Sequence, residues 1–229
     1  MGKDGLQVAI DGPASAGKST VAKIVAHKFN YIYVDTGAMY RALTLAALDQ
    51  RLELTNEDQL IELLRQITIS FQPASAGQRV FINETEVTDE IRSEIVTNNV
   101  STVAALPAIR KALVARQQEL ALAGGIVMDG RDIGTTVLPR ADLKLFLVAS
   151  VAQRAKWRYL ENQQKGITTS LKTLQAEIAE RDYKDSHRAT SPLRKAPDAI
   201  EIDTTSLTIE QVCEQITRLM IQKANEFRK

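Results

Sequence analysis

The residues with the clearest chemical meaning are 12–19, which read GPASAGKS. They match the pattern G-x-x-x-x-G-K-[ST] between an apolar run and an amphipathic stretch, as expected of a phosphate-binding loop. Glycines let successive backbone N–H groups turn toward a phosphate at the positive end of the following helix. Lys18 would then lie beside the β- and γ-phosphates of a nucleoside triphosphate, and Ser19 would bind Mg²⁺. The alternative is a glycine-containing strand-to-helix turn that binds nothing.

Two more polar segments follow apolar runs. The first, residues 35–41 (DTGAMYR), offers Thr36 and Arg41 to a second anion; the alternative is a helix N-cap with a solvated arginine. In the second, residues 129–132 (DGRD), Asp129 would hold the water shell of Mg²⁺ and Arg131 would bind phosphate with two N–H groups. A polar turn with a local ion pair is the alternative reading of that segment.

Further charged residues recur at helical spacing near the C-terminal half. Arg181, Asp185 and Arg188 lie at i, i+4 and i+7, which predicts one shared helical face. A solvated ladder of ion pairs would have the same spacing. If these groups do face a ligand, arginines from several segments would surround two phosphorylated molecules and stabilise the charge that develops in phosphoryl transfer.

The charged helical stretch 150–170, interrupted at residues 165–166, is a candidate lid that would exclude water from such a reaction. Arg154 and Arg158 lie at i and i+4 on it. Arg110 falls on an Ala-rich helix, where a surface arginine that extends along apolar neighbours is the simplest interpretation.

The elements that must position these residues follow from the hydrophobic pattern. Short apolar runs alternate with helical patterns, which predicts an α/β fold with a five-stranded parallel sheet covered on both faces. The stripe Val21, Ile24, Val25 and Phe29 predicts the buried face of the helix after the phosphate loop. The predicted strands are residues 6–11, 31–35, 125–129, 143–148 and 199–202.

One stretch breaks this alternation. Two alternating runs, 67–71 and 79–83, flank a turn-rich gap and predict an antiparallel hairpin, with a third short strand at Glu86 and Val87. The hairpin would be an insertion on the α/β core. A helix is expected over residues 37–50, between the second strand and this insertion.

Composition excludes several classes of protein. The 229 residues are 44% hydrophobic and 25% charged, as in globular proteins. With 29 basic and 28 acidic residues, a net charge of +1 gives no overall attraction to nucleic acid or anionic membranes. The single cysteine, Cys213, excludes an internal disulfide and a cysteine zinc cluster. No apolar run approaches the roughly 20 residues of a membrane span, and the first residues show no signal-peptide core, so we expect a cytoplasmic protein.

Taken together, the motifs resemble those of the bacterial-type cytidylate kinases, over essentially the full length of the chain. The phosphate loop alone marks only a superfamily, but the ordered set with a β-rich insertion is far more specific. The matching segments are residues 11–20, 35–41, 87–92, 129–135 and 180–182 together with Asp185 and Arg188.

The resemblance implies transfer of the γ-phosphate of Mg·ATP to CMP or dCMP, without a covalent phosphoenzyme. It also implies the nucleoside monophosphate kinase fold in one domain, generally monomeric. The core would comprise residues 1–36, 106–149 and 171–229. The monophosphate-binding region with its insertion would be 37–105, and the short helical lid 150–170.

Site residues carry over by position. The resemblance assigns catalytic roles to Lys18, Arg131, Arg158 and Arg181, and Mg²⁺ to Ser19 with Asp129 through water. ATP would bind to Gly12, Pro13, Ala14, Ser15, Ala16, Gly17, Lys18, Ser19, Thr20, Arg154 and Arg158. CMP would bind to Thr36, Arg41 and Arg131 through its phosphate, to Ser101, Arg110, Asp132 and Arg188 at the base, to Arg181 and Asp185 at the ribose, and near Asp129.

The sequence departs from the family pattern in the lid, and other functions are also compatible with the phosphate loop. Trp157 stands between the lid arginines, where related chains often carry another basic residue, and Tyr40 is either near the base or a core aromatic. Other readings are a kinase for UMP or a non-nucleotide alcohol, and a nucleotide-dependent switch or RNA-associated ATPase. The chain lacks the N-K-x-D segment of guanine-reading GTPases.

Overall fold

The structure is a computed structural model and describes residues 5–74, 77–164 and 166–227. Its larger sheet contains five parallel strands in the order β2-β6-β1-β7-β8. All five predicted apolar runs are strands of this sheet, and the predicted α/β class is confirmed. The strands are Gln7–Asp11 (β1), Ile32–Asp35 (β2), Ile126–Gly130 (β6), Leu143–Val148 (β7) and Ile200–Asp203 (β8).

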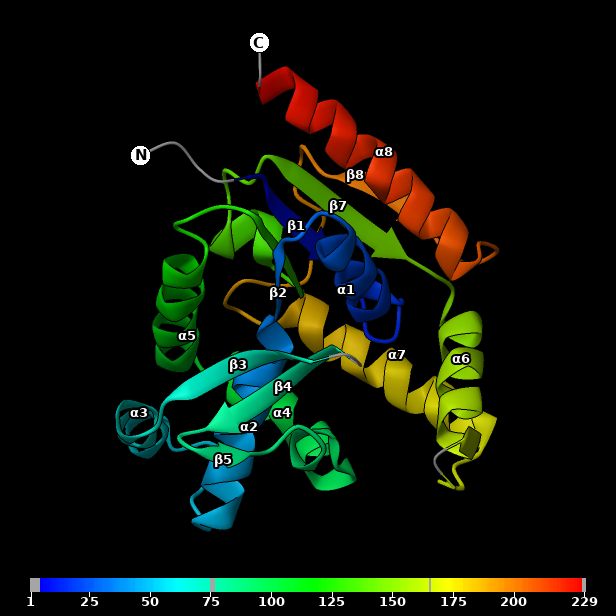
Figure 1. Ribbon diagram of the computed structural model, residues 1–229. Helices are drawn as coiled ribbons and strands as arrows, with labels where there is room; N and C mark the ends of the chain where they lie inside the picture. Colours follow the sequence, from blue (N-terminus) through cyan, green and yellow to red (C-terminus); the bar gives the residue numbers. More distant parts are fainter. Residues whose placement is uncertain (1–4, 75–76, 165, 228–229) are drawn as a thin grey trace.

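Both faces of this sheet are covered, which is why its strands read as continuous apolar runs. On β1, Val8 and Ile10 pack toward α1 (Lys18–Lys28) and α8 (Ile209–Phe227). Ala9, between them, faces a second cluster formed with a π-helical turn over Ile133–Val137 and with the helix α5 (Pro107–Leu120). Figure 1 shows α1 and α8 on one side of the sheet and α5 on the other.

The predicted buried stripe of α1 is correct for Val21 and Val25 but wrong for Ile24. Ile24 is 44% exposed, whereas Val21 and Val25 are buried against the sheet. The reason is that Ile24 lies on the side of α1 that lines the open cleft.

The insertion forms a layer of its own beside the core. Its hairpin is antiparallel, as predicted, and the third strand begins one residue earlier than expected; residues 75–76 of the predicted turn lie outside the described part of the chain. Leu60, Leu64 and Val103 build a separate hydrophobic cluster there, to which α5 contributes Leu113. The elements of this layer are α2 (Thr36–Asp49), α3 (Glu57–Gln66), β3 (Ile69–Ala74), β4 (Gly77–Ile82), β5 (Thr85–Glu86), a 3₁₀ turn (Glu90–Arg92) and α4 (Glu94–Ala105).

The charged stretch after β7 is helical, as predicted. It forms α6 (Val151–Gln164), which packs through Ala155 against Leu174 and Ile178 of α7 (Leu171–His187). Residue 165, at the predicted interruption, is outside the described residues. The prediction that Arg188 shares a helical face with Arg181 and Asp185 is wrong. The helix ends at His187 and Arg188 is extended (φ −64°, ψ 143°), so its side chain leaves the chain in a different direction.

Within the described residues, no helix combines the length and the apolar character that a bilayer span requires. Residues 1–4, which bear on the expectation that no signal peptide is present, lie outside the described part.

Candidate functional site

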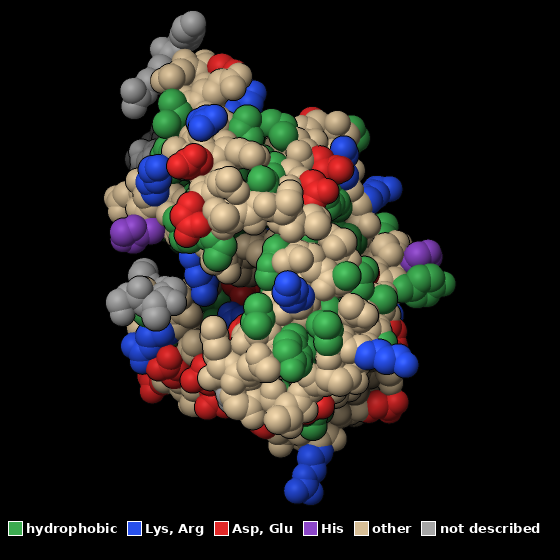
Figure 2. All heavy atoms as spheres, turned by 90° about the vertical axis from the view of Figure 1, so that its right-hand side faces the viewer, with side chains coloured by type: hydrophobic (Ala, Val, Ile, Leu, Met, Phe, Trp, Pro, Cys, Tyr) green, Lys and Arg blue, Asp and Glu red, His purple; other side chains and the backbone are tan. Residues whose placement is uncertain are grey.

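A cleft of about 2160 Å³ opens at the carboxyl ends of the central parallel strands. The space-filling view shows a hollow between the upper and lower parts of the molecule, with basic and acidic side chains inside its rim (Figure 2). Of the predicted site residues, Gly12, Pro13 and Arg154 do not line the cleft. The cleft brings together Ala14, Ser15, Ala16, Gly17, Lys18, Ser19, Thr20, Thr36, Arg41, Ser101, Arg110, Asp129, Arg131, Asp132, Arg158, Arg181, Asp185 and Arg188.

The phosphate loop connects β1 to α1, and two of its glycines, Gly12 and Gly17, have a positive φ that favours glycine. Gly12 has φ of 147°, and a Cβ there would lie 2.0 Å from the backbone oxygen of Leu147 on β7. Gly17 is left-handed at φ 79° and precedes the first turn of α1. The loop therefore lies directly against the sheet while its backbone turns toward the cleft, as an anion-binding nest requires.

Lys18 is nearly buried at the start of α1. Its Nζ donates to the backbone oxygen of Pro13 over 2.7 Å, which holds the ammonium group across the loop. Burial, followed by repulsion from Arg131, lowers the pKa of Lys18 to about 7. A bound polyphosphate would reverse this effect because nearby negative charge favours the ammonium form.

Asp129 at the end of β6 orders the polar groups around the loop. One carboxylate oxygen accepts from Ser19 Oγ at 2.8 Å and the other from the Tyr33 hydroxyl at 2.7 Å. Thr36 Oγ1 donates to the backbone oxygen of Asp129 at 2.8 Å. Because β2 and β6 are adjacent and in register from Ile32 to Asp35, their carboxyl ends bring these groups together.

This set of oxygens fits Mg²⁺. A hydroxyl and a carboxylate lie within 2.8 Å of one another, and Mg²⁺ is usually held by one or two such ligands together with water and substrate phosphates. No group of three or more His, Cys, Asp or Glu side chains suited to a metal occurs within the described residues. Any ion here would therefore depend on a phosphate-bearing ligand to complete its coordination.

Three arginines, Arg41, Arg131 and Arg181, line a cationic recess of the cleft near Thr36 and repel one another. Arg41 donates to the Ile91 backbone oxygen (3.1 Å) and to Thr97 Oγ1 (2.9 Å), which corrects the interpretation of a solvated arginine. Burial, followed by repulsion from Arg181, lowers the pKa of Arg41 to about 9. For Arg181, burial and then repulsion from Arg131 lower the pKa to about 10. Groups that repel one another in this way favour an anion between them.

Arg131 and Arg181 differ in how they are held. Arg131 Nε donates to Asp185 Oδ2 at 2.9 Å, and this attraction, acting against burial, keeps the pKa of Arg131 raised. Arg181 has a buried Nε without a hydrogen-bond partner in the described structure. A buried, unsatisfied donor next to other cations is costly unless a ligand accepts from it.

Asp132 forms the centre of a second polar cluster in the same cleft. It is ion-paired with Arg110, and its other oxygen lies 3.4 Å from Arg188 Nη2. Arg110 is 2% exposed, so the interpretation of a surface arginine is wrong: α5 turns it inward, where Ala104 O accepts a second N–H at 3.0 Å. Ser101 of α4 lines the cleft in this part of the molecule.

In and behind this cluster, three buried side-chain atoms have no partner within normal hydrogen-bond geometry among the described residues. They are the hydroxyl of Tyr40, Nε of Arg110 and Nε2 of Gln117. The Tyr40 ring lies under the Arg110 guanidinium at 5.3 Å, and burial raises the pKa of the Tyr40 hydroxyl to about 12. Tyr40 thus supports the arginine with its ring and keeps its proton.

The two arginines predicted for the lid have different surroundings. Arg154 is 3% exposed and binds the backbone oxygens of Ala149 and Ala14 and the carboxylate of Asp182. Arg158 lines the cleft, and its Nη1 lies 3.3 Å from Oε2 of Glu161, which is also on α6. Arg158 therefore faces the open volume, whereas Arg154 is committed to protein groups.

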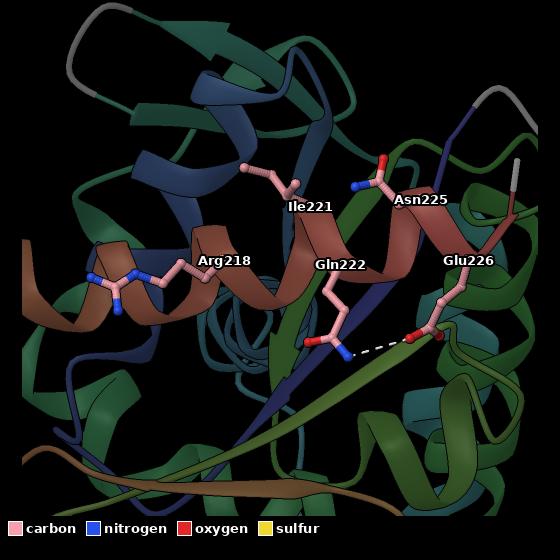
Figure 3. Close-up of a pocket in the computed structure, with 5 residues that line it drawn as sticks. All are labelled: Arg218, Ile221, Gln222, Asn225 and Glu226. Atoms are coloured by element: carbon pink, nitrogen blue, oxygen red, sulfur yellow. Dashed lines mark hydrogen bonds between the residues drawn. The ribbon is translucent and has the colours of Figure 1, made fainter.

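A smaller hollow of about 500 Å³ lies along α8 and shares no lining residue with this cleft. Figure 3 shows its lining, from Arg218 to Glu226, in which Gln222 donates to Glu226 over 3.3 Å. Its side chains come from one helix and include neither a nucleophile nor a group of converging cations. It therefore offers little basis for a chemical site.

Sequence reasoning missed Tyr33, Asp182 and Gln117. A weak signal existed for Tyr33, because alternation along β2 places it on the same face as Asp35, beside the end of β6. Asp182 follows Arg181 in the segment 180–182, but nothing local indicates that its carboxylate reaches Ala14. Gln117 reads as an ordinary helical residue of α5.

Comparison with known proteins adds an independent finding. The sequence profile of the family described as cytidylate kinase matches residues 8–222. The chain is 58% identical over 223 residues to the cytidylate kinase of Lactiplantibacillus plantarum, covering 97% of this chain and 98% of that one. It is 56% identical over 219 residues to the cytidylate kinase of Bacillus subtilis, covering 96% and 98%. An uncharacterized protein from Eubacterium ventriosum shares the fold with a TM-score of 0.50 and 14% identity, over 94% and 98% of the two chains.

Proposed function

This chain belongs to the cytidylate kinase family, and we propose that it transfers the γ-phosphoryl group of ATP to CMP or dCMP, giving ADP and CDP or dCDP. The structural observation that carries the proposal is buried Asp132, paired with Arg110 and Arg188 in the same cleft as the phosphate loop. A cleft with these two features suits a triphosphate together with a cytosine nucleotide.

The base would be distinguished by its hydrogen-bonding edge. Cytosine carries an N4 amine that donates and an N3 that accepts, and uracil reverses both roles. Asp132 and Ser101 would accept from the amine, and Arg110 would donate to a ring acceptor, with Arg188 near the base. Uracil would leave these buried groups facing mismatched partners, which is costly in a water-excluded site.

The rest of the acceptor would bind to the cationic recess. We assign the phosphate of CMP to Thr36, Arg41 and Arg131, close to Asp129, and the ribose to Arg181 and Asp185. Support comes from the unsatisfied Nε of Arg181 and from the mutual repulsion among the arginines, which a phosphate would relieve.

The donor would lie on the other side of the recess. Residues 12–20 would surround its phosphates, chiefly through the backbone N–H groups of residues 15–20, because Pro13 has no N–H and the Ala14 N–H donates to Asp182. Lys18 would lie beside the β- and γ-phosphates. Arg158 would approach the triphosphate from α6. Arg154 belongs to the same proposed set, and its contacts with Ala14 and Asp182 connect α6 to the loop.

Transfer requires little covalent chemistry from the protein. An oxygen of the CMP phosphate attacks the γ-phosphorus in line, while the bond from that phosphorus to the β–γ bridging oxygen breaks and ADP leaves. The attacking oxygen is already anionic, so no general base is needed. Lys18, Arg131, Arg158 and Arg181 would stabilise the charge spread over the transferred oxygens.

Mg²⁺ would be held by Ser19, with Asp129 acting through coordinated water. When bound, the ion supplies positive charge to the β- and γ-phosphates. The chain's own contribution is orientation: Ser19 and Tyr33 fix the two oxygens of the Asp129 carboxylate.

We also propose a function for each region of the chain. Residues 37–105 would bind the monophosphate and 150–170 would act as the lid, on a core of 1–36, 106–149 and 171–229. The hydrophobic cluster of residues 37–105 is distinct from the clusters on the two faces of the sheet, which supports a region of its own, joined to the core through Ile109 and Leu113 of α5. We further propose a monomeric enzyme that acts on free nucleotides in the cytoplasm, in keeping with its single free cysteine.

The test is formation of ADP from Mg·ATP with CMP, dCMP, UMP and AMP offered separately. We expect rapid turnover with both cytidine nucleotides and little with UMP or AMP. Comparable turnover with UMP would refute the assignment of the base while leaving the phosphate chemistry. Slow hydrolysis that no monophosphate stimulates would instead indicate a nucleotide-dependent switch or ATPase.

A further inference from the structure

Asp182 of α7 and Arg154 of α6 both form hydrogen bonds with the backbone of Ala14 in the phosphate loop. Asp182 Oδ1 accepts from the Ala14 N–H at 3.2 Å, and Arg154 Nη1 donates to the Ala14 backbone oxygen at 2.9 Å. The two side chains are themselves ion-paired at 2.6 Å. Three groups thus form a closed set of contacts between the loop and two helices far away in the sequence.

This set of contacts is shielded from water, so its geometry is well defined. The side chain of Arg154 is 4% exposed and that of Asp182 20% exposed. Arg154 Nε also donates to Ala149 O at 2.8 Å, which anchors the guanidinium to the end of β7. A pair of opposite charges held this way resists displacement, because removing either partner leaves a buried charge unpaired.

We propose that Asp182 is a positioning residue of the phosphate loop, acting on Ala14 directly and through Arg154, and that it sets the affinity for the donor nucleotide. The proposal rests on the donor role proposed above for residues 12–20. Asp182 itself contacts no phosphate in this scheme. Its effect is to keep the loop's N–H groups aimed at one place, because recognition by backbone donors depends on their fixed direction.

Removing the Asp182 carboxylate should have opposite effects on ADP affinity according to whether Asp182 acts only through its charge or by positioning the loop. Arg131 is sensitive to the charge of Asp182. Loss of this negative charge would by itself strengthen the binding of any anion in the cleft, ADP and CMP alike. Loss of a positioning contact instead weakens donor binding and leaves acceptor binding unchanged or stronger.

The experiment measures dissociation constants of Mg·ADP and, separately, of CMP by calorimetry with the full-length protein. For Asp182→Ala we expect ADP to bind at least tenfold more weakly and CMP equally well or more tightly. Asp182→Asn retains an oxygen that accepts from Ala14 but loses the ion pair with Arg154. Its affinity for ADP should therefore lie between those of the wild type and Asp182→Ala. Glu180→Gln is the matched control, since it removes an acidic charge from the same helix at an exposed pair with Lys184.

Each outcome has a distinct meaning. Unchanged or tighter ADP binding in the Asp182 variants overturns the inference, as does an equal loss for ADP and CMP. A lowered melting temperature with unchanged ADP affinity shows a purely structural ion pair and also overturns it. If Asp182→Ala does not fold, Asp182→Asn decides, because it should weaken ADP binding while CMP binding stays unchanged or becomes tighter. Wild-type protein that binds ADP but not CMP contradicts the proposed function instead.

Discussion

The hydroxyl of Tyr33 donates to one oxygen of the Asp129 carboxylate at 2.7 Å, while Ser19 donates to the other at 2.8 Å. Asp129 is 4% exposed, and burial, together with repulsion from Asp35, raises its pKa to about 6. The two donors oppose this shift because they favour the ionised carboxylate. Tyr33 therefore orients the carboxylate from β2 and also helps to keep it charged.

Replacing Tyr33 by Phe should raise the Mg²⁺ concentration needed for half-maximal activity by about tenfold, the lower range for loss of an outer hydrogen bond at a metal site. The measurement is a Mg²⁺ titration of ADP formation at saturating nucleotides. Tyr31→Phe is the matched control, since the Tyr31 hydroxyl accepts from Leu6 N (2.9 Å). An equal shift in both variants would contradict a specific role for Tyr33.

Asp132→Asn should remove much of the preference for cytosine. The substitution removes the negative charge and replaces one of the two acceptor oxygens, which now face Arg110 and Arg188, by an NH₂ group that only donates. We expect kcat/KM for CMP to fall roughly 10- to 100-fold, consistent with about 1–3 kcal/mol per unsatisfied buried group. Activity with UMP should change much less.

The control for this prediction is Asp142→Asn. Asp142 accepts from Gln7 N at 2.7 Å, at the amino-terminal end of the sheet. A parallel fall for CMP and UMP in Asp132→Asn would mean that Asp132 supports the fold rather than the choice of base.

The Asp185–Arg131 pair should make stability depend on acid pH. Burial would raise the pKa of Asp185, but Arg131 and then Arg181 outweigh it, so the folded pKa lies below the ordinary value. A depressed folded pKa contributes stability that is present above the unfolded pKa of about 3.9 and is lost as pH falls through the folded pKa. This window lies below about pH 4.

Urea unfolding of wild type and Asp185→Asn at several pH values provides the measurement. At pH 7 we expect the variant to be less stable by roughly 2–3 kcal/mol, somewhat below the range for breaking a fully buried pair. The difference should shrink as the pH falls below 4. Glu214→Gln, at an exposed position on α8, should show no comparable change. A difference that is independent of pH would contradict an electrostatic origin.

Gly12→Ala should prevent stable folding. The added Cβ would meet the backbone oxygen of Leu147 at 2.0 Å, and neither β7 nor the loop has a flexible side chain there to move away. We expect a loss of about 4 kcal/mol or more, seen as low soluble yield and early urea unfolding. Gly17→Ala is the comparison: nothing lies within 4 Å, so only its left-handed φ of 79° costs roughly 1 kcal/mol. Equal stability of the two variants would contradict this account.

Much of this protein follows from its sequence alone. The apolar runs specify the five core strands because side chains buried on both faces leave little room for polar residues. The loop at 12–19 is recognisable because its glycines and Lys18 serve contacts within a few residues of one another. Since parallel strands end at one edge, Asp35 and Asp129 could be expected near the loop before any coordinates were known.

Tertiary structure decided the rest. Arg110 reads as a surface residue and is buried, whereas Ile24 reads as core and borders the cleft. Asp182 reaches Ala14 across 168 positions in the sequence, and Tyr33 meets Asp129 across 96. Periodicity and propensity report only a residue's own strand or helix, so they determine which elements form. Which face of one element meets which residue of another depends on how the whole chain packs, and that relationship has no local signal.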